Sequence, residues 1–307
     1  MGRLVDGQWT KTSIITSGKK GEYDRLPRTF RDKIASDHPV FQPESGRYHL
    51  YVSYACPWAH RCLIYRTLKG LEDHITVDVV HPDLLDNGWT FDQGDNSLGA
   101  TGDRLNGKKY LYEIYQSASS NISTSVTVPV LWDKKTKTIV NNESSEIIRI
   151  FNSAFNGLTG NEDDYYPEAL RSEIDSLNDL IYPNINNGVY RSGFAKSQEA
   201  YDSAIHGLFE TLEILEKRLA HRHYLLGDQI TEADLRLVPT LLRFDSVYHT
   251  HFKCNLKKIS EFPNLNRYLN RFEKMAAVAS TTHREHIKRH YYYSHGEINP
   301  YRIIPIG

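Results

Sequence analysis

A cysteine stands where a strand is expected to end and a helix to begin, within residues 54–59, which read YACPWA. Backbone N–H groups and the helix dipole favour an anion there, and they lower a cysteine pKa from about 8.5 to between roughly 3.5 and 7.5. Ala59 occupies the place of the second cysteine of a dithiol enzyme, and Cys62 lies six residues, almost two helical turns, after Cys56. We therefore predict that Cys56 is a catalytic thiolate whose resolving thiol comes from another molecule.

A proline opens a later predicted strand, in the dipeptide Val128-Pro129. Cis X–Pro bonds are uncommon in general, so a trans proline in an edge strand is the alternative interpretation. The strand–cysteine–helix context favours cis, which would leave the N–H and C=O of Val128 free to pair with the backbone of a bound peptide. Pro129 is therefore expected to be a structural residue of a peptide-binding edge.

A second polar pair, Glu143-Ser144, is expected at the start of a helix. Ser144 would offer its hydroxyl and nearby N–H groups to a carboxylate, and Glu143 would offer its charge to an ammonium group. Simple helix capping is the alternative for both residues. An amino-acid head group carries both charges, as the γ-glutamyl end of glutathione does. Together with the thiol and Val128, this pair points to glutathione as the co-substrate.

Three histidines, His283, His286 and His290, share one face of a predicted helix at spacings that could bind zinc. No carboxylate or thiol nearby completes such a site. We expect surface histidines and no metal. Cys254 follows Phe252 and Lys253 and is expected to be structural.

Strands and helices alternate in the first half of the chain, which must position these residues. Pro57 suits the first turn of the helix that follows the cysteine. The expected strands are 49–53, 75–80, 126–132 and 137–140, and the expected helices are 58–69, 109–116 and 144–151, with a loop over 83–107 and Asn142 as the cap of the last helix. A βαβ unit followed by a hairpin and a helix is the thioredoxin arrangement.

Helical periodicity dominates the second half, so the predicted fold is a thioredoxin-like α/β domain followed by an all-α bundle. Thr231 and Asp234 have the spacing of a capping box and are expected to be structural. The expected divisions are an N-terminal extension (1–45), a thioredoxin-like glutathione-binding domain (46–156), a helical substrate-binding domain (165–292) and a C-terminal tail (293–307).

Composition excludes several functional classes. A chain of 307 residues suits about two domains. The formal net charge of −1 gives no reason to expect nucleic acid or a membrane surface as a partner. No apolar run approaches the length of a membrane span, and Met1–Lys20 lacks the apolar stretch of a signal peptide. Three cysteines are too few for a disulfide framework and suit a reducing compartment, so we expect a cytoplasmic protein.

Several motifs resemble those of the Xi class of glutathione transferases, the glutathionyl-hydroquinone reductases, which are relatives of the omega class. The matching segments are 56–61, 88–89, 127–133, 141–149, 187–190, 227–234, 243–245, 251–254 and 286–300. The resemblance covers nearly all of the chain from residue 38. It implies the glutathione transferase fold and a homodimer.

The resemblance also implies roles for particular residues. Glutathione would be bound by Trp89, Val128, Glu143 and Ser144 around Cys56, and the hydroquinone oxygens by Tyr190, Tyr248 and Tyr291. In the family a basic residue often precedes the Val-Thr-Val-Pro run, and here that position is Ser125. If that base helps to hold a glutathione carboxylate, another residue must do so in this chain.

The implied reaction removes glutathione from glutathionyl-hydroquinones through a Cys56–glutathione mixed disulfide, giving hydroquinone and oxidised glutathione. Two alternatives remain open at this point. The same thiol would serve an omega-like thiol transferase or dehydroascorbate reductase. Less in keeping with an intact thiol site, the fold could serve as a non-catalytic scaffold.

Overall fold

The computed structural model describes residues 2–11, 16–18, 20–24 and 27–306, so residues 1, 12–15, 19 and 25–26 of the expected N-terminal extension and residue 307 of the expected tail lie outside it. Contacts divide the chain into two compact units. Unit 1 comprises Met1–Ile14, Leu26–Asp163 and Thr281–Ser294, and unit 2 comprises Ile15–Arg25, Asp164–Ser280 and His295–Gly307. Residues 281–294 are thus grouped with the first half of the chain.

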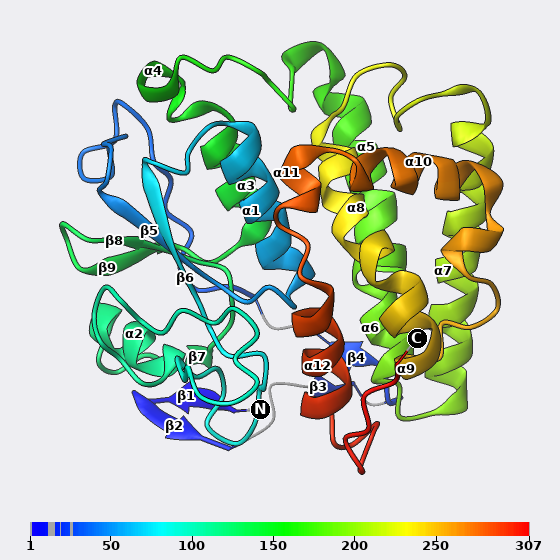
Figure 1. The fold of residues 1–307 in the computed structure, drawn as a ribbon, viewed down its shortest axis with the longest axis horizontal. Helices are drawn as coiled ribbons and strands as arrows, with labels where there is room; N and C mark the ends of the chain where they lie inside the picture. The colour runs from blue at the N-terminus through cyan, green and yellow to red at the C-terminus, as the bar shows by residue number, and fades with distance from the viewer. Residues whose placement is uncertain (1, 12–15, 19, 25–26, 307) are drawn as a thin grey trace. The chain divides into compact units, whose positions relative to one another are not determined.

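A four-stranded mixed sheet forms the centre of unit 1 (Figure 1). Its strands are ordered β6 (Ile75–Val79), β5 (Tyr48–Val52), β8 (Val130–Asp133) and β9 (Thr138–Asn141). Strand β5 is parallel to β6 and antiparallel to β8, which is antiparallel to β9. This is the thioredoxin-like topology predicted from the order of the elements.

Helices α1 (Pro57–Leu68) and α3 (Ser144–Ser153) pack against each other, and α2 (Leu111–Ala118) lies on the other side of the sheet (Figure 1). Pro57 occupies the first turn of α1, as predicted. Ile147, Ile148 and Phe151 of α3 are fully buried. The short helix α4 (Asn156–Thr159) follows. Burial of these apolar side chains holds the start of α1 and the start of α3 in place beside the sheet.

The N-terminal segment contains strands that the sequence analysis did not predict. Strands β1 (Arg3–Val5) and β2 (Gln8–Thr10) form a hairpin, and β1 also pairs with β7 (Thr124–Ser125). Leu4 is fully buried. Strands of two or three residues are too short to show an alternating pattern, so no local signal in the sequence predicts them.

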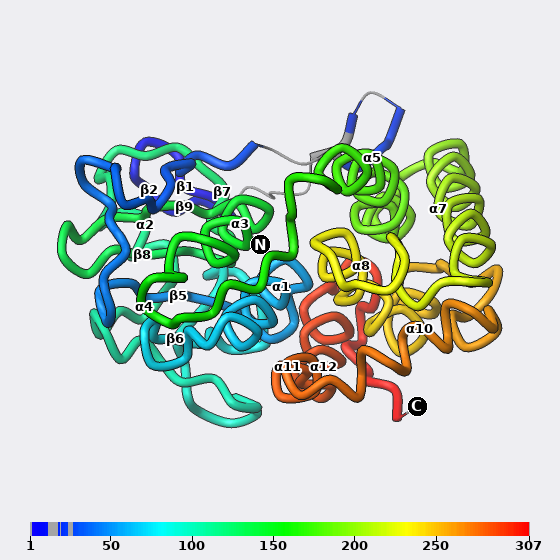
Figure 2. The backbone as a smooth tube through the Cα atoms, turned by 90° about the horizontal axis from the view of Figure 1, so that it is seen from above, coloured from blue at the N-terminus to red at the C-terminus, as the bar shows by residue number. Residues whose placement is uncertain are grey.

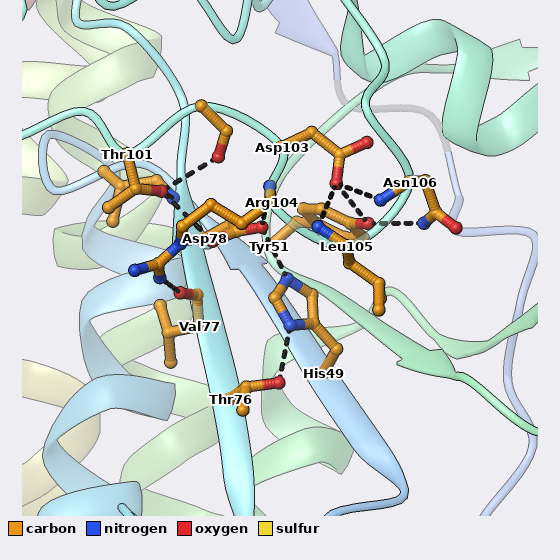
Figure 3. Close-up of polar contacts among 12 residues, drawn as sticks. His49, Tyr51, Thr76, Val77, Asp78, Thr101, Asp103, Arg104, Leu105 and Asn106 are labelled. Carbon is orange, nitrogen blue, oxygen red and sulfur yellow. Dashed lines mark hydrogen bonds and ion pairs between the residues drawn. The ribbon is translucent and has the colours of Figure 1, made fainter.

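The loop between β6 and α2 is tied to the sheet by polar contacts to a buried carboxylate, Asp78 (Figure 3). Asp78 of β6 accepts hydrogen bonds from Nε of Arg104 at 2.6 Å and from the Arg104 backbone N–H at 2.8 Å. His49 Nε2 lies 3.4 Å from the Asp78 carboxylate. Burial alone would raise the pKa of Asp78, but the bonds from His49 and Arg104 outweigh it and leave that pKa below its usual value.

A second carboxylate folds the loop on itself (Figure 3). Asp103 accepts hydrogen bonds from the backbone N–H groups of Leu105, Asn106 and Lys108 and from the hydroxyl of Tyr51. The predicted loop over 83–107 therefore lacks helices and strands but has a fixed internal structure.

Unit 2 is helical, as predicted, and α8 (Glu232–Arg243) lies among its other helices with almost every residue buried (Figure 2). The other α-helices are α5 (Arg171–Ile181), α6 (Gly188–Gly193), α7 (Gln198–Arg218), α9 (His249–His251), α10 (Pro263–Glu273) and α11 (Ala276–Ala279). The 3₁₀ segments are η1 (Glu168–Leu170), η3 (Leu219–His221) and η5 (Ile259–Glu261), and the π segments are η2 (Tyr182–Asn186) and η4 (Phe244–Tyr248). Strands β3 (Thr16–Ser17) and β4 (Tyr23–Asp24) also belong to this unit.

The capping box at the start of α8 is present. The buried carboxylate of Asp234 accepts from the backbone N–H and the hydroxyl of Thr231 at 2.9 and 3.0 Å. It also accepts from the Leu225 N–H and from the Tyr268 hydroxyl, both at 2.9 Å. Burial raises the pKa of Asp234 despite these bonds. Both carboxylate oxygens are thus used inside the protein.

No helix among the described residues is both long and apolar enough to cross a membrane.

Candidate active site

Cys56 lies at the turn between β5 and α1 and is the N-cap residue of α1, with φ −75° and ψ 118°. Its backbone N–H donates to the Ser53 carbonyl at 3.1 Å, and its carbonyl accepts from the His60 N–H at 2.9 Å. The side chain is half-buried and makes no capping hydrogen bond. Instead the thiol donates to the carbonyl of Val128 at 3.5 Å. This places the sulfur between the helix start and the Val128 backbone.

The other two cysteines are fully buried. Burial raises the pKa of Cys62 well above its ordinary value, against the opposing charge of Arg61, and burial likewise raises the pKa of Cys254. Both thiols are therefore held protonated and out of reach. Of the three cysteines, Cys56 is the one that a substrate can approach.

The Val128–Pro129 peptide bond is cis, as predicted. The preceding residue, Thr127, is anchored because its carbonyl accepts from the Tyr115 hydroxyl at 2.8 Å and its N–H donates to that hydroxyl at 3.3 Å. The N–H of Val128 has no acceptor among the described residues. A backbone donor and acceptor of Val128 therefore lie next to Cys56.

Glu143 and Ser144 begin α3. The Oε1 atom of Glu143 accepts from the backbone N–H and the hydroxyl of Ser145, each at 3.0 Å, and the Ser144 hydroxyl lies 3.5 Å from the same atom. Glu143 is therefore a helix cap. Its Oε2 atom receives no hydrogen bond from the described residues.

Asn142 was expected to cap α3, and that expectation is wrong. Glu143 is the N-cap, and the Asn142 side chain is used elsewhere. Its carbonyl oxygen accepts from the Phe30 N–H at 3.2 Å, and its amide donates to the Tyr115 hydroxyl at 3.1 Å. A partner more than a hundred positions away could not be read from the local pattern.

Trp89 lies in the loop after β6, and its indole is nearly buried. It stacks on the imidazole of His290, with ring centroids 4.9 Å apart and planes inclined by 22°. His290 belongs to helix α12 (Arg284–Ser294), which is part of unit 1. Unit 1 therefore contains all five residues of the expected glutathione site: Cys56, Trp89, Val128, Glu143 and Ser144.

The two histidines of α12, His286 and His290, are not on the surface, which corrects the expectation for them. His286 and His290 are buried, and His283 is half-buried with its ring stacked on Tyr54 at a centroid distance of 3.5 Å. Within the described part of the chain, no cluster of three or more His, Cys, Asp or Glu side chains is arranged to hold a metal ion. Sequence reasoning missed the contacts of this helix because their partners lie about 200 positions away.

Tyr190 and Tyr248 lie close together in unit 2, with ring centroids 6.0 Å apart. Phe252 contacts both rings, at 5.4 Å from Tyr190 and, stacked, at 5.5 Å from Tyr248. Tyr190 is half-buried and Tyr248 fully buried. Tyr291 is buried on α12 in unit 1, edge-on to His290 at 5.1 Å. Two of the three expected hydroquinone ligands thus share one aromatic cluster.

Comparison with known proteins gives matches over both halves. The family models for the glutathione S-transferase N-terminal and C-terminal domains match residues 55–154 and 198–271. The glutathionyl-hydroquinone reductase YqjG of Escherichia coli (strain K12) is 52% identical over 314 residues, covering 100% of this chain and 95% of that protein. The glutathionyl-hydroquinone reductase PcpF of Sphingobium chlorophenolicum is 49% identical, with 100% and 96% covered.

Solved structures of glutathione transferases are similar to this chain over nearly its whole length. The glutathione S-transferase Xi of Phanerochaete chrysosporium has a TM-score of 0.89 at 52% identity, with 92% of this chain and 97% of that chain covered. The glutathione-bound structure of Escherichia coli YqjG has a TM-score of 0.91 at 50% identity, with 100% and 95% covered. With a lone accessible thiol at a strand-to-helix turn, a cis-proline edge beside it and full-length similarity of this degree, the chain belongs to the Xi class of the glutathione transferase family.

Proposed function

We propose that the chain is a glutathionyl-hydroquinone reductase, which takes glutathione from a glutathionylated hydroquinone and releases hydroquinone and oxidised glutathione. The observation that carries this is the monothiol centre. Cys56 is accessible at the start of α1, Ala59 stands where a second cysteine would be, and Cys62 is fully buried. The two relatives named as glutathionyl-hydroquinone reductases, at 52% and 49% identity, support the substrate class.

The Cys56 thiolate attacks the sulfur of the glutathionyl group. The new S–S bond forms as the aryl C–S bond breaks, and the departing aromatic carbon takes up one proton, so the ring is reduced to hydroquinone. A second glutathione thiolate then attacks the mixed disulfide, forms oxidised glutathione and returns Cys56 to the thiolate. A serine at this position would favour conjugation, because only a sulfur nucleophile forms the disulfide.

Groups of unit 1 match the functional groups of glutathione. The free N–H of Val128 and its carbonyl are suited to the cysteinyl backbone of the tripeptide. The unused Oε2 of Glu143 is suited to the γ-glutamyl ammonium, and the Ser144 hydroxyl to the neighbouring carboxylate. Trp89 would pack its indole against the peptide.

Arg3 is our candidate for the base that Ser125 does not supply. The two residues face each other in the antiparallel pair of β1 and β7. Side chains at such positions lie on the same face of the sheet, with Cβ atoms about 5 Å apart. The Nε atom of Arg3 is buried and has no hydrogen-bond partner among the described residues. We propose that this guanidinium attracts a glutathione carboxylate.

Tyr190, Tyr248 and Tyr291 are proposed to donate their phenol hydroxyls to the hydroquinone oxygens. The pairing of Tyr190 and Tyr248 in one aromatic cluster supports a shared task for these two. We further propose a homodimer in the cytoplasm, where glutathione is kept reduced.

A mass and turnover experiment tests the proposal. Wild type treated with oxidised glutathione should gain the mass of one glutathionyl group, and Cys56→Ser should gain none and lose reductase turnover by at least a thousandfold. Cys62→Ser is the matched control and should keep both properties. Full reductase turnover in Cys56→Ser would overturn the mechanism, and absence of a mass gain in wild type would favour the scaffold.

A substrate panel separates the remaining enzymatic alternative. The proposal expects higher kcat/KM for glutathionyl-hydroquinones than for dehydroascorbate or small mixed disulfides. Tyr190→Phe and Tyr248→Phe should lower only the hydroquinone activity. A preference for dehydroascorbate would instead favour an omega-like reductase.

A further inference from the structure

Helix α12 contacts other parts of unit 1 at several points, although all of Asp164–Ser280 separates it from them in the sequence. Arg289 forms a two-pronged ion pair with Asp83, at 2.8 and 2.7 Å. The Ser294 hydroxyl accepts from the Leu84 N–H at 2.9 Å. Both partners lie in the loop that follows β6 and leads to Trp89. These contacts therefore hold α12 against this loop.

His290 is held on two sides. Its Nδ1 atom lies 2.8 Å from the Pro82 carbonyl, which can only accept, so Nδ1 carries the proton. The face of the ring stacks on Trp89 at 4.9 Å. Since the loop at Pro82 and the helix both restrain the imidazole, the imidazole in turn restrains the plane of the indole.

His286 reaches the turn that carries Cys56. Its Nδ1 atom lies 3.2 Å from the Leu98 carbonyl, so Nδ1 is the donor there and Nε2 is left as an acceptor. Nε2 lies 3.4 Å from the Ser53 hydroxyl, whose oxygen accepts from the Ala55 N–H at 3.2 Å. Burial lowers the pKa of His286 to about 3, so the ring stays neutral and its acceptor is retained at neutral pH.

Ser53 also binds the catalytic residue directly, because its carbonyl accepts from the Cys56 N–H at 3.1 Å. A chain of hydrogen bonds thus runs from Leu98 through His286 and Ser53 to the backbone on which the thiol is mounted. Each donor in this series of hydrogen bonds has an acceptor, so the direction of every bond in the series is defined.

We propose that His286 and His290 are positioning residues of the glutathione site, His286 for the turn that presents Cys56 and His290 for the indole of Trp89. This rests on the proposed function. Neither imidazole is assigned a contact with substrate; each acts through a residue of the site. The two histidines should therefore fail in different ways, His286 in thiol reactivity and His290 in glutathione binding.

The proposed role of His290 is tested by titrating the full chain with glutathione while tryptophan fluorescence is monitored. His290→Ala removes the stack and should weaken binding roughly three- to tenfold and shift tryptophan emission. His290→Phe keeps an aromatic face on the indole and should recover most of the affinity. Glu285→Ala, an exposed substitution on the same helix, should match wild type. Wild-type affinity and emission in a folded His290→Ala, or failure of Phe to recover affinity, would overturn this arm.

The His286 arm is tested by the rate at which iodoacetamide alkylates Cys56 across a range of pH. His286→Asn offers a donor to Leu98 but cannot reach Ser53, and it should slow alkylation at pH 7 several-fold. Ser53→Ala should give the same pH profile, and the double variant should be no slower than either single variant. Additive effects, or an unchanged profile in both variants, would overturn this arm.

Neither readout requires reductase turnover. If the hydroquinone proposal were wrong, Cys56 alkylation and glutathione titration would still report on the two histidines. If only the positioning proposal were wrong, wild type would show reductase activity and the histidine variants would match it.

Discussion

Two helix starts in this molecule use a carboxylate as a cap, but they differ in how many of its oxygens are hydrogen-bonded within the protein. At α8 in unit 2, the carboxylate of Asp234 is fully buried and both of its oxygens receive hydrogen bonds from the protein. At α3 in unit 1, the carboxylate of Glu143 is half-buried and one of its oxygens has no donor among the described residues. A closed cap can only stabilise the fold, whereas an open cap can also bind a ligand.

The largest effect should come from removing the closed cap. Asp234→Ala leaves the Leu225 N–H, the Thr231 N–H and the Tyr268 hydroxyl without their buried acceptor. The free energy of unfolding should fall by about 3 kcal/mol, measured by urea denaturation. Glutathione affinity should stay unchanged at a temperature where the variant is folded. Weakened glutathione binding in the folded variant would break the distinction between the two caps.

Asp78 is a second closed carboxylate, and pH should distinguish it from Asp234. The pKa of Asp78 is lowered, so its contribution is present above the unfolded value of about 4 and is lost as pH falls through the folded pKa. The pKa of Asp234 is raised, so its ionisation instead reduces stability as pH rises. Asp78→Asn should cost about 2 kcal/mol at pH 7 and less at pH 3, by urea denaturation at both values. A cost that grows on acidification would contradict the assignment.

At the open cap, Glu143→Gln should affect binding rather than stability. The amide oxygen can still accept from the Ser145 N–H, so the unfolding free energy should change by no more than about 0.5 kcal/mol. The negative charge is lost, so the KM for glutathione should rise roughly tenfold. Calorimetric titration with glutathione measures the effect directly. Equal affinity in the two proteins would mean that Glu143 is a cap and nothing more.

The smallest effect should come from Arg3, at the other charged end of the proposed glutathione site. Arg3→Ala should raise the KM for glutathione roughly threefold, more at low salt than at high salt. Adding Ser125→Lys should restore the lost affinity, because the two positions face each other. Lys135→Ala removes an exposed charge in the hairpin turn and serves as the control. If the lysine at 125 restores nothing, Arg3 does not act at this site.

The parts of the fold that the sequence predicted are those with a long enough local pattern. Helix α1 begins at Pro57 as expected, the sheet order follows from the sequence of elements, and the cis bond at Pro129 follows from its context. In each case the deciding signal lies within a few residues of the feature.

The parts that it missed depend on distant partners. The strands β1, β2 and β7 exist because the short segment β1 pairs with both β2 and β7. Asn142 is not the cap of α3 because its amide binds Phe30 and Tyr115. His286 and His290 looked like a polar face because their spacing shows which helix face they share but not what covers it. For the site, the thiol and its helix start were readable locally, and the residues that hold Trp89 were not.

The position of α12 in the chain has a consequence for biosynthesis. A ribosome completes Cys56, Trp89 and Val128 early, but the histidines that contact Ser53 and Trp89 emerge only after the whole of Asp164–Ser280 has been made. A nascent chain therefore carries Cys56 for the whole of that interval without the His286 contact to Ser53 and without the His290 stack on Trp89. The hydrogen bonds that link Leu98 through His286 and Ser53 to the Cys56 backbone can therefore form only after α12 has been synthesised.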